Sequence, residues 1–188
     1  MGGEKLAKSF CMKLISRWIQ TGLIALVVFF SLVQPVLATT VVNPRDIMTR
    51  QQVSVESIHQ IRFVSPTGAM DSSDTITLTF PSGFDLSTLT YSAIQLASGN
   101  PGSEAPRTVA ATPGVGTWGA SISGQTITLT ASTNPAGGSG ISGGKTVVIT
   151  IGGATGNRII NPSSVGTYTV AIAGTFGDRG LLSLPIRS

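Results

Sequence analysis

Cysteine and charge are the scarcest features of this 188-residue chain. The single cysteine, Cys11, excludes a disulfide framework and any metal or redox site built from several cysteines. Charged residues make up 11% of the chain, whereas an average soluble domain has about 25%. We therefore expect its surface to depend on neutral polar side chains.

The formal net charge of +4 arises mostly in the first twenty residues. After Ala38 there are eight Lys or Arg residues and seven Asp or Glu residues, and Lys145 is the one lysine among them. A nucleic-acid-binding surface needs Lys and Arg clustered on the folded domain. The sequence therefore excludes nucleic acid as an expected partner.

The N-terminal segment is typical of a secretory signal peptide. Residues 5–17 are basic, residues 22–33 are uninterruptedly apolar, and Pro35 precedes the small-residue site Val36-Leu37-Ala38. We expect this signal helix to be removed after Ala38 and the rest of the chain to be secreted or held at the extracellular cell surface. Met12 is an alternative start to Met1, because a signal peptide beginning there is also complete.

An uncleaved anchor is the alternative to cleavage. Residues 19–38 would then be the chain's contact with the membrane, since a segment of this length nearly spans a hydrocarbon core of about 30 Å. In both cases the predicted organisation is a signal segment at 1–38, an N-terminal segment at 39–51 and a β-sandwich domain at 52–188.

Hydrophobic residues alternate with polar ones along several segments after residue 45. Residues 75–80 and 126–131 both begin Thr-Ile-Thr-Leu-Thr, and residues 145–151 and 167–173 alternate in the same way. Such alternation indicates antiparallel strands with one buried and one solvated face. Glycine- and proline-containing turns separate the strands, so the sequence predicts an all-β antiparallel sandwich. The residues predicted to form its core are Ile76, Leu78, Phe80, Ile127, Leu129, Val147, Ile149, Tyr168, Val170 and Ile172.

One strand start points to an immunoglobulin-like sandwich. Gly166-Thr-Tyr168 resembles the tyrosine corner of immunoglobulin-like domains, in which a tyrosine near the start of strand F bonds to upstream backbone. An ordinary core tyrosine is the alternative. The segments Asp74-Thr-Ile-Thr-Leu-Thr-Phe-Pro-Ser-Gly-Phe-Asp85 and Ile160-Asn-Pro-Ser-Ser-Val-Gly-Thr-Tyr-Thr-Val170 also resemble immunoglobulin-like modules of secreted and cell-surface bacterial proteins, of the adhesin or surface-layer type. This resemblance covers residues 52–186 and implies an adhesive or structural role without catalytic residues.

Three catalytic or nucleotide-binding motifs match by letter but lack their structural context. Gly114-Val-Gly116-Thr-Trp-Gly119 has no helix after it, although a dinucleotide site needs one. Gly140-Ile-Ser142-Gly-Gly144 lies in a glycine-rich loop, and Gly144-Lys145-Thr146 lacks the first glycine of a phosphate-binding loop. His59, the one histidine, lies in an alternating strand and has no sequence partners for catalysis. We therefore expect no enzyme.

Two weak binding sites remain as predictions. Asp71 and Asp74, with Asp178, supply carboxylates of the kind that Ca²⁺ prefers, although Asp is also common in turns; no other cofactor is expected. Trp118 and Tyr91 are the candidates for stacking on a sugar ring. The two threonine rows are also what an ice-binding surface needs, but they lie far apart in the sequence, and threonine is favoured on exposed strand faces.

We accordingly predict a secreted, non-catalytic, structural or adhesive module of the cell surface. Its partners would be other surface proteins or glycans. Two alternatives stay open: a carbohydrate-binding module, and a filament or array subunit. In the second, residues 39–50 would pair with an edge strand of a neighbouring copy, because unpaired edge strands present free backbone groups.

Overall fold

The computed structural model describes residues 38–153 and 157–188, and the predicted signal helix lies outside them. The described chain is built of β-strands and two short 3-10 helices, η1 (Tyr91–Ala93) and η2 (Pro135–Gly137). No helix in these two ranges is long and apolar enough to cross a membrane. This part of the chain is all-β, as the alternation predicts.

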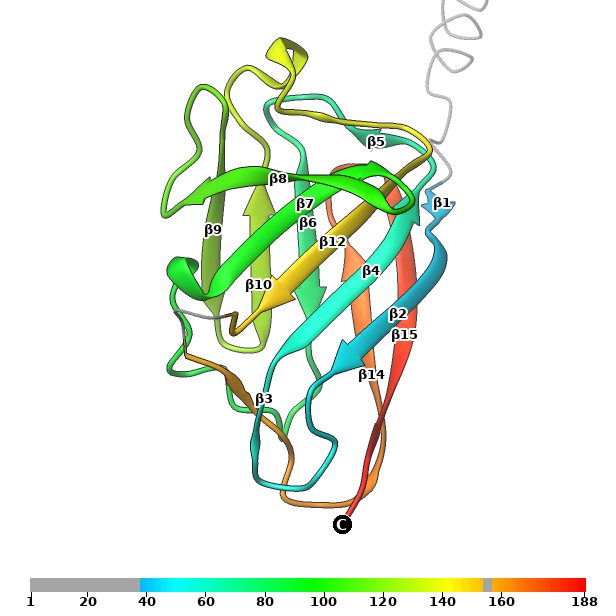
Figure 1. The fold of residues 1–188 in the computed structure, drawn as a ribbon, viewed down its shortest axis with the longest axis vertical. Helices are drawn as coiled ribbons and strands as arrows, with labels where there is room; N and C mark the ends of the chain where they lie inside the picture. The colour runs from blue at the N-terminus through cyan, green and yellow to red at the C-terminus, as the bar shows by residue number, and fades with distance from the viewer. Residues whose placement is uncertain (1–37, 154–156) are drawn as a thin grey trace, which may run out of the picture. The chain divides into compact units, whose positions relative to one another are not determined.

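Ten long strands form two layers that face each other, as Figure 1 shows. The front sheet has the order β2 (Val42–Met48), β4 (His59–Ser65), β12 (Lys145–Ile151), β7 (Ile94–Asn100) and β8 (Ser103–Ala110). The back sheet has the order β15 (Asp178–Ile186), β14 (Gly166–Ala173), β6 (Thr75–Thr79), β10 (Thr126–Thr130) and β9 (Thr117–Ser123). Short strands complete the fold: β1 (Thr39–Thr40), β3 (Glu56–Ser57), β5 (Gly68–Ala69), β11 (Ile141–Ser142) and β13 (Ile159–Ile160).

Hydrogen bonds connect the two layers into one continuous sheet. β8 pairs with β9 in parallel over Thr108–Ala110, where the front sheet passes into the back sheet. β1 pairs in parallel with β15, and the chain then continues into β2 of the front sheet. The other strand pairs are antiparallel, which is the arrangement that the sequence predicts.

The inward-facing residues of both sheets form one hydrophobic core. Nine of the ten predicted core residues are buried, and the tenth, Tyr168, is half-buried and packs against them. Fully burying one such aliphatic or aromatic side chain contributes about 1.5–3 kcal/mol. The predicted strand registers are therefore confirmed, since a slip of one residue would have exposed the whole set.

Tyr168 makes the hydrogen bond of a tyrosine corner. Its hydroxyl donates to the backbone carbonyl of Ser164, four residues upstream, over 2.9 Å. The ring packs edge-on against Phe84, with 5.5 Å between the ring centroids. The tyrosine-corner interpretation is therefore confirmed over the alternative of an ordinary core tyrosine.

The predicted boundary between residues 39–51 and the sandwich needs correction. The structure places residues 39–48 inside the sandwich, because β1 bonds to β15 and β2 is an integral strand of the front sheet. The sequence concealed β2 because Asn43 and Pro44 interrupt the alternation. A β-bulge accommodates these two residues, with Asn43 in the left-handed region at a φ of 51°.

Candidate binding surfaces

Trp118, predicted to stack on a ligand, lies in the core. Its side chain is 0% exposed, and its indole N–H donates to the backbone carbonyl of Ser139 over 2.8 Å. A buried indole normally finds such a partner. Neither face of the ring is open to a sugar, so the structure does not support the predicted role of Trp118.

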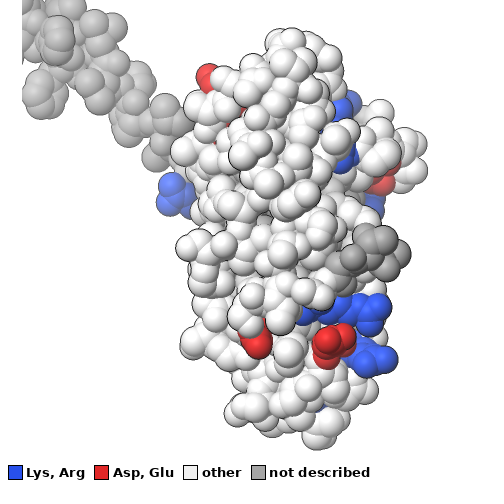
Figure 2. Space-filling view, turned by 90° about the vertical axis from the view of Figure 1, so that its left-hand side faces the viewer, with Lys and Arg blue, Asp and Glu red and all other residues white. Residues whose placement is uncertain are grey.

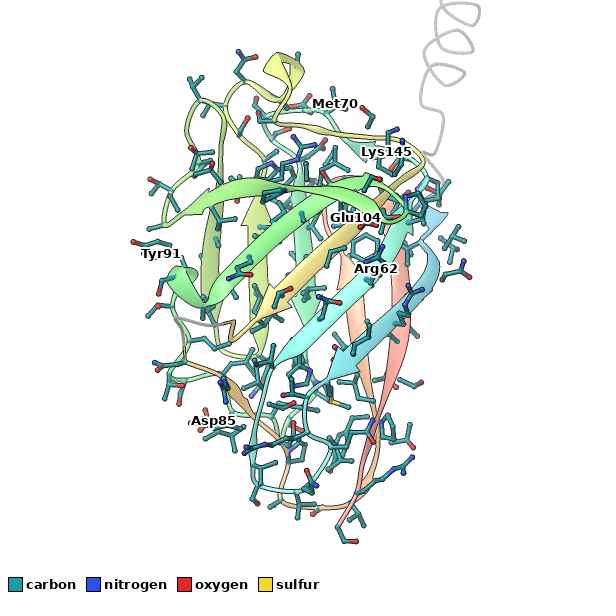
Figure 3. The ribbon with its side chains drawn as sticks, in the orientation of Figure 1. Arg62, Met70, Asp85, Tyr91, Glu104 and Lys145 are labelled. Atoms are coloured by element: carbon teal, nitrogen blue, oxygen red, sulfur yellow. The ribbon has the colours of Figure 1, made fainter. Side chains whose placement is uncertain are left out.

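Tyr91 is the exposed member of the predicted aromatic pair. It belongs to η1, is 43% exposed, and lies at the outer margin of the molecule in Figure 3. The structure therefore does not bring Tyr91 and Trp118 together on one surface.

The three predicted calcium ligands have separate structural roles. Asp71 accepts hydrogen bonds from the backbone N–H and the hydroxyl of Ser73, both at 2.9 Å, and these bonds lower the pKa of its carboxyl. Asp74 accepts a hydrogen bond from the backbone N–H of Asp71 over 2.9 Å. Both carboxylates thus stabilise one exposed turn.

Asp178 is buried and joins three parts of the chain. It accepts hydrogen bonds from the hydroxyl of Ser65 (2.5 Å), the backbone N–H of Thr67 (3.2 Å) and the hydroxyl of Thr39. Within residues 38–153 and 157–188, no three His, Cys, Asp or Glu side chains form a group that could hold a metal ion. The structure therefore does not assemble the predicted calcium site from these three residues.

A buried His–Asp pair lies between the sheets, and no sequence pattern predicts it. Nδ1 of His59 is 2.5 Å from Oδ2 of Asp46, and both side chains are fully buried. The imidazole packs edge-on against Phe80 and Phe84, with 5.7 and 5.9 Å between the ring centroids. No substrate can reach a pair enclosed in this way, so its contribution is to the core.

The two threonine rows, distant in the sequence, are neighbours in the back sheet. The strands pair so that Thr75, Thr77 and Thr79 of β6 lie directly opposite Thr130, Thr128 and Thr126 of β10. Residues directly opposite each other share a face of the sheet, and the alternating isoleucine and leucine residues are buried. The hydroxyls of Thr79 and Thr126 are 3.2 Å apart. The six threonines thus form one array on the outward face.

The array is the centre of a wider uncharged surface. The four adjacent strands β14, β6, β10 and β9 contain no Asp, Glu, Lys or Arg residue. Viewed from the side of β8 and β9, Figure 2 likewise shows charged side chains in a few separate patches on a mostly uncharged surface. We name the outward side of these four strands the hydroxyl face. Its outward residues are Thr75, Thr77, Thr79, Ser121, Ser123, Thr126, Thr128, Thr130, Thr167, Thr169, Ala171 and Ala173.

A cavity of about 330 Å³ opens beside the end of the back sheet. Asp85, labelled in Figure 3, stands at this cavity, and hydrogen bonds from Ser87 lower the pKa of its carboxyl. The amide nitrogen of Gln125 donates to the backbone carbonyl of Phe84 over 3.1 Å. The cavity thus combines apolar and polar walls. Its lining residues are Asp85, Leu86, Ser87, Leu89, Ile122, Gly124 and Gln125.

The outward face of the front sheet carries charge, in contrast to the hydroxyl face. Arg45 of β2 lies directly opposite Arg62 of β4, and Arg62 forms an ion pair with Glu104 of β8. The Nζ of Lys145 donates to the side chain of Asn100 over 2.8 Å. Figure 3 shows Arg62, Glu104 and Lys145 in one region near the hairpin between β7 and β8. The two sheets therefore present chemically different surfaces.

Comparison with known proteins gives a likeness of fold. No protein-family model and no curated protein matches the chain. Among solved structures, it resembles the N-terminal domain of the Streptococcus gordonii adhesin Sgo0707, with 16% identity, a TM-score of 0.41, and coverage of 77% of this chain and 30% of that one. It also resembles the group B streptococcus pilus 2b backbone protein, with 12% identity, a TM-score of 0.46, and coverage of 76% and 56%.

A further similar structure is the collagen-binding domain of a Staphylococcus aureus adhesin, with 10% identity, a TM-score of 0.43, and coverage of 78% of this chain and 99% of that domain. The chain spans less than two thirds of the first two structures. These similar structures are a bacterial adhesin domain, a pilus backbone protein and a collagen-binding domain.

Proposed function

We propose that this chain is a secreted, non-catalytic module of a bacterial cell-surface protein, which acts by adhesive contact through its hydroxyl face. The observation that carries this proposal is the absence of charged residues from four adjacent described strands, β14, β6, β10 and β9. Solvent-exposed sheet faces commonly carry charged side chains for solubility. A broad uncharged surface is therefore better explained by contact with a partner.

The chemistry of the hydroxyl face favours an uncharged partner. Each threonine or serine hydroxyl can donate one hydrogen bond and accept two, so the array matches surfaces that carry hydroxyl or amide groups. Neutral polysaccharides and fibrous proteins present such groups. A charged partner would lose its hydration without gaining an opposite charge.

Neither alternative function is supported in the form that the sequence predicts. Sugar binding by aromatic stacking would depend on Tyr91 alone of the predicted pair, because Trp118 is buried. A filament formed by donating residues 39–50 would need that segment free, yet β1 and β2 are paired within the chain's own sheets. β8 pairs with β9 only over Thr108–Ala110, and its earlier part carries Glu104 and Pro106, residues that protect unpaired backbone from further pairing.

An adhesion assay tests the proposal. The purified protein is coupled to beads, and retention of the beads under flow is measured on dextran, cellulose and type I collagen. We expect retention on at least one surface, and its loss in the double variant Thr77→Glu/Thr128→Glu, which places two carboxylates at the centre of the hydroxyl face. Retention no greater than that of albumin-coated beads on all three surfaces would contradict an adhesive role.

The in-register threonine array also makes ice a second candidate surface. The sequence argued against ice because the two rows are far apart in the chain, but the structure pairs them directly. Regular spacing of hydroxyl and methyl groups is the property that an ice surface can recognise. Inhibition of ice recrystallisation by the protein, lost in the same double variant, is the result that this second function requires.

A further inference from the structure

The bulge in β2 brings two arginines together on the outward face of the front sheet. The register of β2 on β4 shifts between Val42 and Arg45, with Asn43 in the bulge. Residues directly opposite each other point to the same face of a sheet. The shift therefore places Arg45 opposite Arg62 on the solvent side, whereas an unshifted register would turn Arg45 towards the core.

This arrangement leaves a positive charge without a matching carboxylate. Like charges directly opposite on a sheet are destabilising. Glu104 pairs with Arg62 and also accepts a hydrogen bond from the backbone N–H of Gly102 over 3.0 Å. No ion pair of Arg45 is present within residues 38–153 and 157–188. Among the described residues, Arg62 thus has a carboxylate partner and Arg45 has none, and a further anion would stabilise the pair.

A cavity of about 140 Å³ lies at this arginine pair. Asn43 and Thr146 line it together with the two arginines, so the surrounding residues include an amide and a hydroxyl that can donate hydrogen bonds. A cavity of this size has room for several water molecules or for one small group of a larger ligand. Its lining residues are Asn43, Arg45, Arg62, Phe63, Val64, Pro101 and Thr146.

We propose that this cavity binds a carboxylate group of an acidic polysaccharide. Guanidinium groups bind carboxylates through paired, charge-assisted hydrogen bonds. The next cross-strand row on the same face supplies Gln60, Thr150 and Gln95, whose amides and hydroxyl suit the hydroxyl groups of neighbouring sugar units. The assignment rests on the proposed surface function and names a ligand class for the front sheet, separate from the hydroxyl face.

The test measures binding of a defined acidic oligosaccharide, trigalacturonic acid, by nuclear magnetic resonance of the arginine side-chain N–H groups. Maltotriose is the neutral probe and hexaglutamate the acidic peptide probe. We expect saturable shifts at Arg45 and Arg62 with trigalacturonic acid, and no shifts with maltotriose. Because a hydrogen bond to a charged group contributes about 1.5–3 kcal/mol, Arg45→Gln should weaken binding by about tenfold or more.

Two further variants distinguish a specific binding site from non-specific electrostatic attraction of the acidic oligosaccharide. Arg179→Gln, at an exposed position of β15, removes the same charge elsewhere and should leave affinity unchanged. Thr146→Val removes the hydroxyl of a cavity-lining residue and should weaken binding. The proposal is overturned if Arg179→Gln weakens binding as much as Arg45→Gln, if hexaglutamate binds equally well, or if no saturation occurs up to about 10 mM. None of these variants lies on the hydroxyl face, so we expect them to leave bead retention unchanged. The adhesion proposal and the carboxylate-site proposal can therefore be refuted independently.

Discussion

Asp46 is held inside the sandwich by His59, with 2.5 Å between Oδ2 of the carboxylate and Nδ1 of the imidazole. The bulge in β2 causes this contact as well as the arginine pair. The shifted register places Asp46 opposite Ile61, on the buried face of β4. One extra residue in β2 therefore directs a carboxylate to the core and a guanidinium group to the solvent.

We predict that Asp46→Ala lowers the free energy of unfolding by about 3–5 kcal/mol, because removing one partner leaves the other buried and unpaired. The double variant Asp46→Leu/His59→Phe should lose less, since replacing a buried polar pair by apolar side chains is often close to neutral. Urea denaturation measures both values. A double variant less stable than Asp46→Ala would show that the pair itself stabilises the fold strongly.

The two faces of the strands should respond very differently to truncation. Phe80→Ala or Ile149→Ala creates a cavity at a fully buried position and should cost about 2–5 kcal/mol. Thr77→Ala, on the outward face of β6, should cost less than about 0.5 kcal/mol. Thermal or denaturant unfolding compares the three variants, and similar losses at all three would contradict the register.

The sequence was sufficient to predict the inward faces of the alternating strands, because burial of one face leaves a period of two in the chain. It did not reveal β8, in which Glu104, Pro106 and Arg107 break that pattern at the edge of the front sheet. An edge strand with polar outward residues needs no clear alternation. The prediction of a separate N-terminal segment is wrong for a similar reason: the bulge in β2 interrupts the alternation, so the sequence pattern does not reveal this strand.

The candidate surfaces were less predictable than the fold, because they depend on which strands become neighbours. The threonine rows become one array only through the pairing of β6 with β10. Arg45 lies opposite Arg62 only because the register of β2 on β4 shifts, and no local sequence pattern predicts this shift. The prediction that Trp118 stacks on a ligand is wrong because residue type alone does not show burial.

The carboxyl group of Asp71 should titrate below its ordinary pKa of 3.8, because the backbone N–H of Ser73 and then its hydroxyl bond to the ionised form. Because the pKa of Asp71 is lower in the folded than in the unfolded protein, its ionised carboxylate stabilises the turn at pH values above the unfolded-state pKa. This contribution is lost as the pH falls through the folded-state pKa. Carbon-13 resonances of the carboxyl group follow the titration. Ser73→Ala should raise the midpoint only partly, since the backbone N–H remains; a midpoint at or above 3.8 in the unmodified protein would contradict the turn geometry.

Export should leave a chain that begins at Thr39. Cleavage after Ala38 fits the Val36-Leu37-Ala38 site and preserves β1, in which the N–H of Thr39 donates to the carbonyl of Gly177 over 3.2 Å. Intact-mass measurement of the exported protein tests this prediction. A mass that still includes residues 12–38 would instead support an uncleaved anchor.

Adhesion by two matched variants tests the central claim most directly. Thr77→Glu/Thr128→Glu places two carboxylates on directly opposite residues of the back sheet, and Val42→Glu/Ile47→Glu places two at exposed positions of β2 in the front sheet. Both variants change the net charge equally, and unfolding measurements confirm that each is folded. On the neutral surface that retains the unmodified beads best, we predict that the back-sheet variant loses retention and the front-sheet variant keeps it. Equal retention by both variants, or loss in the front-sheet variant alone, would contradict an adhesive role for the hydroxyl face.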